Sequence, residues 1–450
     1  MNLRCSVLGC AHFLLLLSLI SGYGSASGAQ QRRPNHSATI SSSRLVALQR
    51  ELQRGNRTAL SRFWKRVIKD GTPLVEAMPG DTQNLLVTFL WRGTQDTRNV
   101  VVFLQSGGPN PADNRMARLP NSDVWYRSYT FRKDARFTYT LSPNDDLTPL
   151  NQPNLDWQKR FANVRTDPLN PRRHPTGSGV PQQNVLSVVE LPNAPRQPWV
   201  ASRPGAPQGK VEERRIKSTI LNNERPLWIY TPAGYQTKGS AYPLLILFDG
   251  WSYIHLVPTP LMLDNLIASG QVPPFVAVLV DNPDAAAREL ELPCHKPFAD
   301  FLARELIAWV RESYHVTTDA RRTVIAGSSY GGLASTCAAL WYPELFGNVL
   351  SQSASYWWKP DNDPDYEWVR RQFITRPKLP LRFYLTVGLL ETLPKPGNTN
   401  QVEVNRCLRD ALRVKGYEVH YTEFNGAHEY VNWQGTLADG LIALTGKWKT

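Results

Sequence analysis

The fold is decided by one stretch of the sequence, Thr323-Val324-Ile325-Ala326-Gly327-Ser328-Ser329-Tyr330-Gly331-Gly332-Leu333. Its first four residues form an apolar run typical of a buried strand, and residues 333–340 have the pattern of a helix. Residues 327–331 match G-x-S-x-G, whose small residues permit a sharp strand-to-helix turn. Ser329 is therefore the candidate nucleophile, because the helix N-terminus places amide dipoles near the negative charge that develops on attack. The alternative is an ordinary glycine-rich turn.

Further apolar runs flank this stretch and alternate with helical segments. They occupy residues 227–230, 244–248, 275–280, 349–351, 381–387 and 419–422. Near-continuous hydrophobic strands are buried on both faces, which indicates a mostly parallel sheet covered by helices. The sequence thus predicts an α/β fold, an α/β-hydrolase catalytic domain over residues 212–450.

Residues 44–200 have a different pattern. Apolar residues at helical spacing predict two short helices between residues 44 and 70, ended by Gly71. Short runs rich in β-branched and aromatic residues follow over residues 85–140 and 185–191, separated by turn residues. This spacing predicts an antiparallel β-sandwich. The proline-rich residues 192–207 are the expected linker.

The first residues predict export. Arg4 precedes the apolar run of residues 13–20, and Ser27-Gly28-Ala29 fits a small-x-small cleavage site. Residues 1–29 therefore have the pattern of a signal peptide, followed by a polar tail over residues 30–43. The alternative is a membrane anchor, but the apolar run is shorter than the ~18–20 residues of a span. No later run is comparable, so we expect an exported protein without a stable membrane span.

Composition narrows the class of protein. The chain has 450 residues with 51 Lys and Arg against 38 Asp and Glu, a net charge of +13. The composition, 42% hydrophobic, excludes a mainly disordered or collagen-like chain. No clustered basic run or nucleic-acid motif is present, so we expect no nucleic-acid partner. Three cysteines would remain after signal cleavage, Cys294, Cys337 and Cys407, which allow at most one disulfide; we expect three small buried side chains.

A serine nucleophile needs a base, and in this fold the chain order is serine, acid, histidine. His428 is the candidate base, because it lies in the loop after the strand-like run 419–424, whereas His420 lies inside that run. Glu391 is the candidate acid, since it follows the preceding strand and its carboxylate could hold the imidazole tautomer. The alternative is a Ser–His dyad with Glu391 as a solvated loop residue.

An oxyanion hole is expected from two backbone amides. One belongs to Tyr330, the residue after the nucleophile, and the other to Trp251, just beyond the strand that ends at Phe248. Asp249 lies between Phe248 and Trp251, and its early position in the chain favours a loop-stabilising role over a catalytic one.

Four further strings occur in order along the chain. They are Arg118-Leu119-Pro120-Asn121-Ser122-Asp123-Val124-Trp125-Tyr126-Arg127, Leu245-Ile246-Leu247-Phe248-Asp249-Gly250, Arg288-Glu289-Leu290-Glu291-Leu292-Pro293-Cys294 and Ser351-Gln352-Ser353-Ala354-Ser355-Tyr356-Trp357-Trp358. With the G-x-S-x-G stretch, they resemble the enterochelin (enterobactin) esterases, which hydrolyse the serine trilactone of catecholate siderophores. The resemblance spans roughly residues 55 to 445, and its first string is similar to that family's N-terminal β-domain.

The resemblance implies Ser329 as nucleophile, His428 as base and Glu391 as acid, with no metal or cofactor needed for hydrolysis. The best-known family members are cytoplasmic, whereas the export signal predicts a periplasmic protein here. A ferric tris-catecholate carries a charge of about −3, which a basic protein attracts. Aromatic faces and cations suit catechols, so Arg288, Trp357 and Trp358 are candidate substrate-binding residues. Core packing for the tryptophans and a structural ion pair for Arg288 are equal alternatives.

The expected function is therefore a serine esterase acting on a ferric catecholate siderophore of the enterobactin type. A carbohydrate or feruloyl ester hydrolase is the alternative among enzymes, because chains of this organisation also act on polysaccharides. A non-catalytic siderophore-binding protein with a vestigial turn is the alternative outside enzymes.

Overall fold

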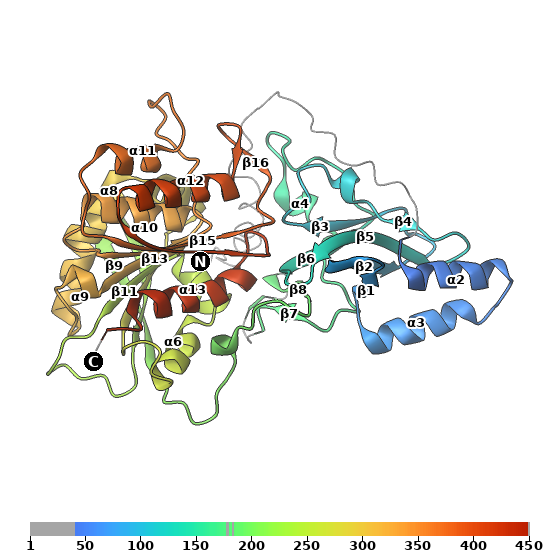
Figure 1. The fold of residues 1–450 in the computed structure, drawn as a ribbon, viewed down its shortest axis with the longest axis horizontal. Coiled ribbons are helices and arrows are strands. Elements are labelled where there is room, and N and C mark those ends of the chain that lie inside the picture. Colours follow the sequence, from blue (N-terminus) through green and yellow to red (C-terminus); the bar gives the residue numbers. More distant parts are fainter. Residues whose placement is uncertain (1–40, 177–179, 182–183, 449–450) are drawn as a thin grey trace, which may run out of the picture.

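The computed structural model describes residues 41–176, 180–181 and 184–448. The predicted signal peptide, residues 1–29, and nearly all of the polar tail, residues 30–43, lie outside the described residues. Helices and two four-stranded sheets form the N-terminal part, and an eight-stranded sheet with helices forms the C-terminal part (Figure 1). None of the helices in the described ranges combines the length and the apolar character that crossing a membrane requires.

The chain begins, within the described part, with the two predicted helices, α2 (Ser43–Gln53) and α3 (Ala59–Asp70). Leu48 and Trp64 bury their side chains against Leu90 and Tyr126 of the neighbouring sheet. Gly71 ends α3 with a φ of 82°, a conformation that glycine adopts without steric cost, and its amide bonds the carbonyl of Val67.

The N-terminal sheets are antiparallel throughout and pack face to face. The first has the order β1 (Leu74–Met78), β2 (Asp81–Arg92), β5 (Val124–Arg132), β4 (Ala117–Arg118). The second has the order β3 (Val100–Leu104), β6 (Arg136–Pro143), β8 (Leu186–Glu190), β7 (Arg173–His174), and the short helix α4 (Trp157–Arg160) precedes β7. Val87 and Phe89 from one sheet share a core with Val102 and Phe137 from the other. The predicted β-sandwich is confirmed.

The C-terminal sheet is parallel over six of its eight strands. Its order is β18 (Glu418–Phe424), β15 (Arg382–Gly388), β14 (Asn348–Gln352), β13 (Thr323–Ser328), β11 (Leu244–Phe248), β12 (Val276–Val280), β10 (Asn223–Thr231), β9 (Lys210–Ser218). A small hairpin, β16 (Pro394–Lys395) and β17 (Thr399–Asn400), lies beside it. The predicted α/β-hydrolase fold is confirmed.

Helices cover both faces of this sheet (Figure 1). They are α5 (Gly250–His255), α6 (Thr259–Ala268), α7 (Ala285–Glu291), α8 (Lys296–Phe301), α9 (Ile307–Ser313), α10 (Tyr330–Trp341), α11 (Trp368–Thr375), α12 (Gln401–Val414) and α13 (Tyr430–Thr445). Ile325 of β13 faces the core under α10 and α12, and its neighbour Val324 faces the core under α6 and α13. The strands are apolar on both faces because each face is buried.

The edge strand β9 has no counterpart among the predicted runs. Its sequence, Lys210 to Ser218, is rich in charge, and it pairs antiparallel with β10, which in turn pairs antiparallel with β12. Charged side chains are tolerated on this strand because it lies at the edge of the sheet, exposed to solvent. Their charge also discourages pairing with a strand of another chain.

Candidate active site

Ser329 lies at the turn between β13 and α10, with a φ of 57° and a ψ of −122°. Such a backbone is strained for a residue with a side chain and is typical of functional turns. A Cβ atom at Gly327 would lie 2.5 Å from the carbonyl carbon of Gly331, so only glycine fits there. The Ser329 amide donates to the carbonyl oxygen of Gln352 (2.9 Å), which fixes the turn to the neighbouring strand β14.

His428 lies in the loop between β18 and α13. Its Nδ1 is 2.6 Å from Oε2 of Glu391, which follows the neighbouring strand β15. The imidazole also packs edge-on against Trp433, with ring centroids 4.8 Å apart. Because the carboxylate can only accept, Nδ1 carries the proton and Nε2 is left as the basic nitrogen.

Glu391 is buried and held through its other oxygen. Oε1 accepts from the Ser353 hydroxyl (2.6 Å) and from the Gly388 amide (2.8 Å). Ser353 in turn accepts from the indole Nε1 of Trp433, the ring that packs on His428. The acid therefore has a fixed orientation, which is what a carboxylate that orients an imidazole requires. The sequence did not single out Ser353, whose role depends on contacts across three segments.

Ser329, Glu391 and His428 lie at one edge of the sheet, each beyond the carboxyl end of its strand. The register pairs Ser328 with Gln352 across β13 and β14, and the order continues through β15 to β18. The structure joins Glu391 to His428 by a hydrogen bond, but the Ser329 hydroxyl makes none with His428. Catalytic hydrogen bonds are often long in unliganded sites and tighten when substrate binds.

The two expected oxyanion donors differ in their surroundings. Tyr330 is the first residue of α10, where a backbone amide has no acceptor within its own helix. The amide of Trp251 faces the Asp281 carboxyl and lowers the pKa of that group. Burial, with a contribution from Asp249, opposes this effect and raises the pKa of Asp281 to about 7. The Tyr330 amide is the better placed donor.

Arg288 forms a bidentate ion pair with Asp249, with Nε and Nη2 at 2.6 and 2.9 Å from the carboxylate oxygens. The guanidinium thus holds the turn beyond β11. The Trp357 ring is buried, and its centroid lies 6.0 Å from that of the Tyr330 ring. Its indole Nε1 donates to Oε1 of Gln401. Trp358 is half-buried and packs edge-on against Trp368. These contacts match the packing and ion-pair alternatives and leave substrate binding by these three residues as a prediction.

A small cavity of about 30 Å³ lies beside the His428–Glu391 pair. Its lining includes Lys395 from the β16–β17 hairpin and Gln105 from the N-terminal part. Burial lowers the pKa of Lys395, although Glu391 opposes that effect. Within the described residues Lys395 forms no ion pair, and its ammonium lies 5.9 Å from the centre of the Trp357 ring. Nothing in the spacing of the sequence pointed to Lys395.

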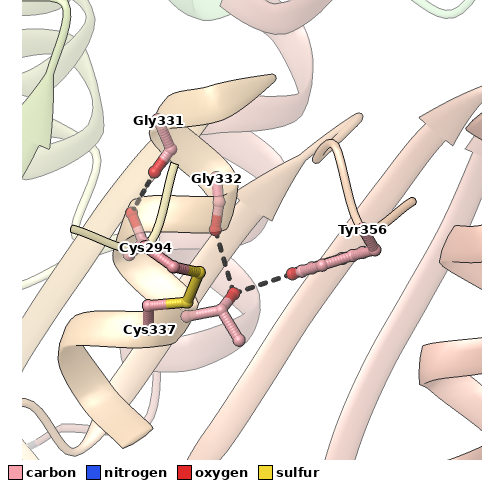
Figure 2. Close-up of a disulfide and its surroundings, with 7 residues drawn as sticks. Cys294, Gly331, Gly332, Cys337 and Tyr356 are labelled. Atoms are coloured by element: carbon pink, nitrogen blue, oxygen red, sulfur yellow. Dashed lines mark hydrogen bonds between the residues drawn. A yellow bond between two sulfur atoms is a disulfide. The ribbon is translucent and has the colours of Figure 1, made fainter. Parts of the chain in front are cut away.

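A disulfide joins Cys294 to Cys337, which lies in α10, the helix that follows Ser329 (Figure 2). It connects the segment between α7 and α8 to α10. In the first turn of that helix, the carbonyl oxygens of Gly331 and Gly332 accept hydrogen bonds from the hydroxyls of Ser335 and Thr336. Cys407 is free and exposed. The expectation of three small buried cysteines was wrong, because the pairing depends on two segments 43 residues apart in the sequence.

Comparison with known proteins finds relatives of both parts of the chain. Residues 86–200 match the family model "Enterochelin esterase, N-terminal", and residues 218–444 match "Putative esterase". The chain is 31% identical to the iron(III) enterobactin esterases of Escherichia coli O6:H1 and Dickeya dadantii; the alignments cover 80% and 85% of this chain and 90% and 93% of theirs. The enterobactin esterase of Shigella flexneri, solved in the presence of enterobactin, is 30% identical with a TM-score of 0.68, covering 85% of this chain and 97% of that one. Since the likeness extends over both parts of the molecule, the chain belongs to the enterochelin (enterobactin) esterase family.

Proposed function

We propose that this protein is a serine esterase that hydrolyses the trilactone ester bonds of a ferric catecholate siderophore of the enterobactin type. The observation that carries the proposal is the His428–Glu391 pair at the sheet edge that also holds Ser329. Similarity to esterases of iron(III) enterobactin over both parts of the chain supports the substrate class.

In the proposed reaction, the Ser329 hydroxyl attacks an ester carbonyl while Nε2 of His428 takes its proton. Glu391 stabilises the imidazolium that forms. The Tyr330 amide, with the Trp251 amide as the second candidate, donates to the oxyanion of the tetrahedral intermediate. The imidazolium then protonates the leaving seryl oxygen, and the ester C–O bond breaks. Water attacks the acyl-enzyme by the same steps and releases a linear catecholoyl-serine acid.

The charge of the protein suits this substrate. The ferric complex carries about −3, and the chain carries +13. At the site itself, Lys395 is a cation without an ion-pair partner among the described residues, beside the His428–Glu391 pair. Opening the trilactone removes preorganisation from the chelate and makes the iron easier to release.

The test uses Ser329→Ala, with Ser328→Ala as the matched control from the same turn. Wild type and the control should convert ferric enterobactin to linear products seen by mass spectrometry, and should react with a fluorophosphonate probe. Ser329→Ala should do neither. Failure of the probe to label the wild type would indicate a binding protein. Faster turnover of a feruloyl-oligosaccharide than of the siderophore would indicate the carbohydrate-ester alternative.

We further propose that the protein acts in the periplasm. The signal pattern over residues 1–29 supports export, and so does the Cys294–Cys337 disulfide, because disulfides persist in oxidising compartments. Fractionation of cells, with mass spectrometry of the mature N-terminus, tests this: the expected chain begins at Gln30 in the periplasmic fraction. Recovery of the uncleaved chain in the cytoplasm would contradict it.

A further inference from the structure

Glu429 directly follows the candidate base His428, and its carboxyl is almost completely buried, with 1% of the residue exposed. Oε2 accepts from the backbone amide of Thr138 (2.9 Å), and Oε1 lies 2.7 Å from the Thr138 hydroxyl. Thr138 belongs to β6, a strand of the N-terminal β-sandwich. The residue beside the base is therefore bound to the other part of the molecule.

The position of Glu429 in the sequence suggests a different partner. It is the N-cap residue of α13, a position where a short polar side chain ordinarily accepts from amides of the first helical turn. No such side-chain bond forms here. Both carboxyl oxygens of Glu429 instead form hydrogen bonds with Thr138. Burial raises the pKa of Glu429 to about 8, although the hydrogen bonds from Thr138 act to lower it. Burying a carboxyl is costly unless it is hydrogen-bonded, and the two bonds to Thr138 offset that cost here.

The loop that carries His428 has further hydrogen bonds to β6 on both sides. The Arg136 amide donates to the Asn425 carbonyl oxygen (2.9 Å), and Asn432 Nδ2 donates to the Arg136 carbonyl oxygen (3.1 Å). A Cβ at Gly426 would lie 2.7 Å from that same carbonyl oxygen, so the two backbones approach closely. In Figure 1, α13 begins on the side of the C-terminal part that faces β6 and β8.

We propose that the N-terminal β-sandwich positions the catalytic histidine, with Thr138 and Glu429 as the positioning pair that holds the His428 loop against β6. This inference rests on the proposed serine-esterase function. Neither residue touches the reacting atoms. They act through His428, whose imidazole must stay aligned between Glu391 and Ser329; a misplacement of ~1 Å can cost ~100-fold in rate.

Substitutions at the two positions separate the hydrogen bonds from the packing. Glu429→Gln keeps both links, because its carbonyl oxygen accepts from the Thr138 amide and its NH₂ donates to the Thr138 hydroxyl. Glu429→Leu removes both while keeping a side chain of similar size. Thr138→Val removes the hydroxyl alone, and Thr140→Val, two residues along β6, is the matched control.

The variants are assayed as the complete mature protein with p-nitrophenyl butyrate, a small ester that needs no siderophore binding. Thr138→Val should lower kcat about 3- to 10-fold and Glu429→Leu about 10-fold or more, with KM within twofold. Glu429→Gln and Thr140→Val should keep kcat within twofold. The double variant Thr138→Val/Glu429→Leu should be no slower than Glu429→Leu, since both changes break one contact.

Unchanged kcat in Glu429→Leu would overturn the proposal. So would a loss of kcat that Thr140→Val reproduces, or one that disappears when activity is corrected for the folded fraction measured by urea denaturation. If the wild type cleaves p-nitrophenyl butyrate but not the siderophore, only the proposed substrate fails. If it cleaves neither ester, the proposed esterase function fails, and this inference with it.

Discussion

Both carboxyl oxygens of Glu391 are occupied, one by His428 and the other by Ser353 and the Gly388 amide. A carboxylate bound in this way cannot turn toward solvent. It fixes the imidazole tautomer that leaves Nε2 free to accept a proton, so the residue is built into the site and is not a solvated loop glutamate.

Glu391→Gln should lower kcat by about 10²- to 10⁴-fold with little change in KM, because a neutral amide stabilises the imidazolium poorly and permits the wrong tautomer. Steady-state kinetics with p-nitrophenyl butyrate measures this, and the exposed Glu344→Gln is the control. A variant that keeps more than a third of wild-type kcat would favour the Ser–His dyad.

Lys395 should distinguish iron-loaded from iron-free substrate. Lys395→Met keeps most of the apolar stem but removes the charge beside the candidate His–Glu pair. We expect kcat/KM for ferric enterobactin to fall about 5- to 20-fold, and that for the uncharged iron-free trilactone to change less than twofold. Lys238→Met, at an exposed position, is the control. An equal loss with both substrates would contradict recognition of the anionic complex.

At the scale of the elements, the disulfide joins the segment before α8 to α10, the helix whose N-terminus lies at Ser329. In the chain-entropy description, closing a loop of this length stabilises the fold by ~4 kcal/mol. The double variant Cys294→Ser/Cys337→Ser should lose about that free energy of unfolding in urea denaturation. Cys407→Ser, which removes the free exposed thiol, should leave it unchanged.

The contact between β6 and the start of α13 should also give stability a dependence on pH. Burial raises the pKa of Glu429 from its ordinary 4.5 to about 8, so the folded protein holds this proton where the unfolded chain has lost it. The stabilisation is complete below pH 4.5 and is lost as the pH rises toward 8. Unfolding free energies of wild type and Glu429→Gln at pH 5, 6.5 and 8 measure it: the wild type should lose stability relative to the variant. A constant difference across this range would contradict the prediction.

At the scale of the whole molecule, the excess positive charge should steer an anionic substrate. We expect kcat/KM for ferric enterobactin to fall several-fold as ionic strength rises from 20 to 200 mM, because salt screens charges over the Debye length. The rate with uncharged p-nitrophenyl butyrate should stay nearly constant. Equal salt dependence with both esters would show that the net charge plays no part in capture.

Local patterns of the sequence predicted much of this molecule. The turn at Ser329 was predicted because its strand, turn and helix are consecutive, and the buried parallel strands were predicted because burial on both faces makes them apolar throughout. The pairing of His428 with Glu391 was predicted from the order of groups in this fold, and the structure joins the two by a hydrogen bond; their catalytic roles stay predictions. The charged edge strand β9 was missed because most of its side chains are exposed to solvent. It therefore lacks the run of apolar residues by which the other strands were recognised.

The sequence by itself determined the two-part architecture, the strained turn and the types of side chain available for chemistry, because these depend on neighbours along the chain. Only the tertiary structure decided which groups meet: Ser353 with Glu391, Cys294 with Cys337, Lys395 with the cavity, and Thr138 with Glu429 across 291 residues. Such contacts follow from how sheets and loops pack, and no short-range period in the chain encodes them.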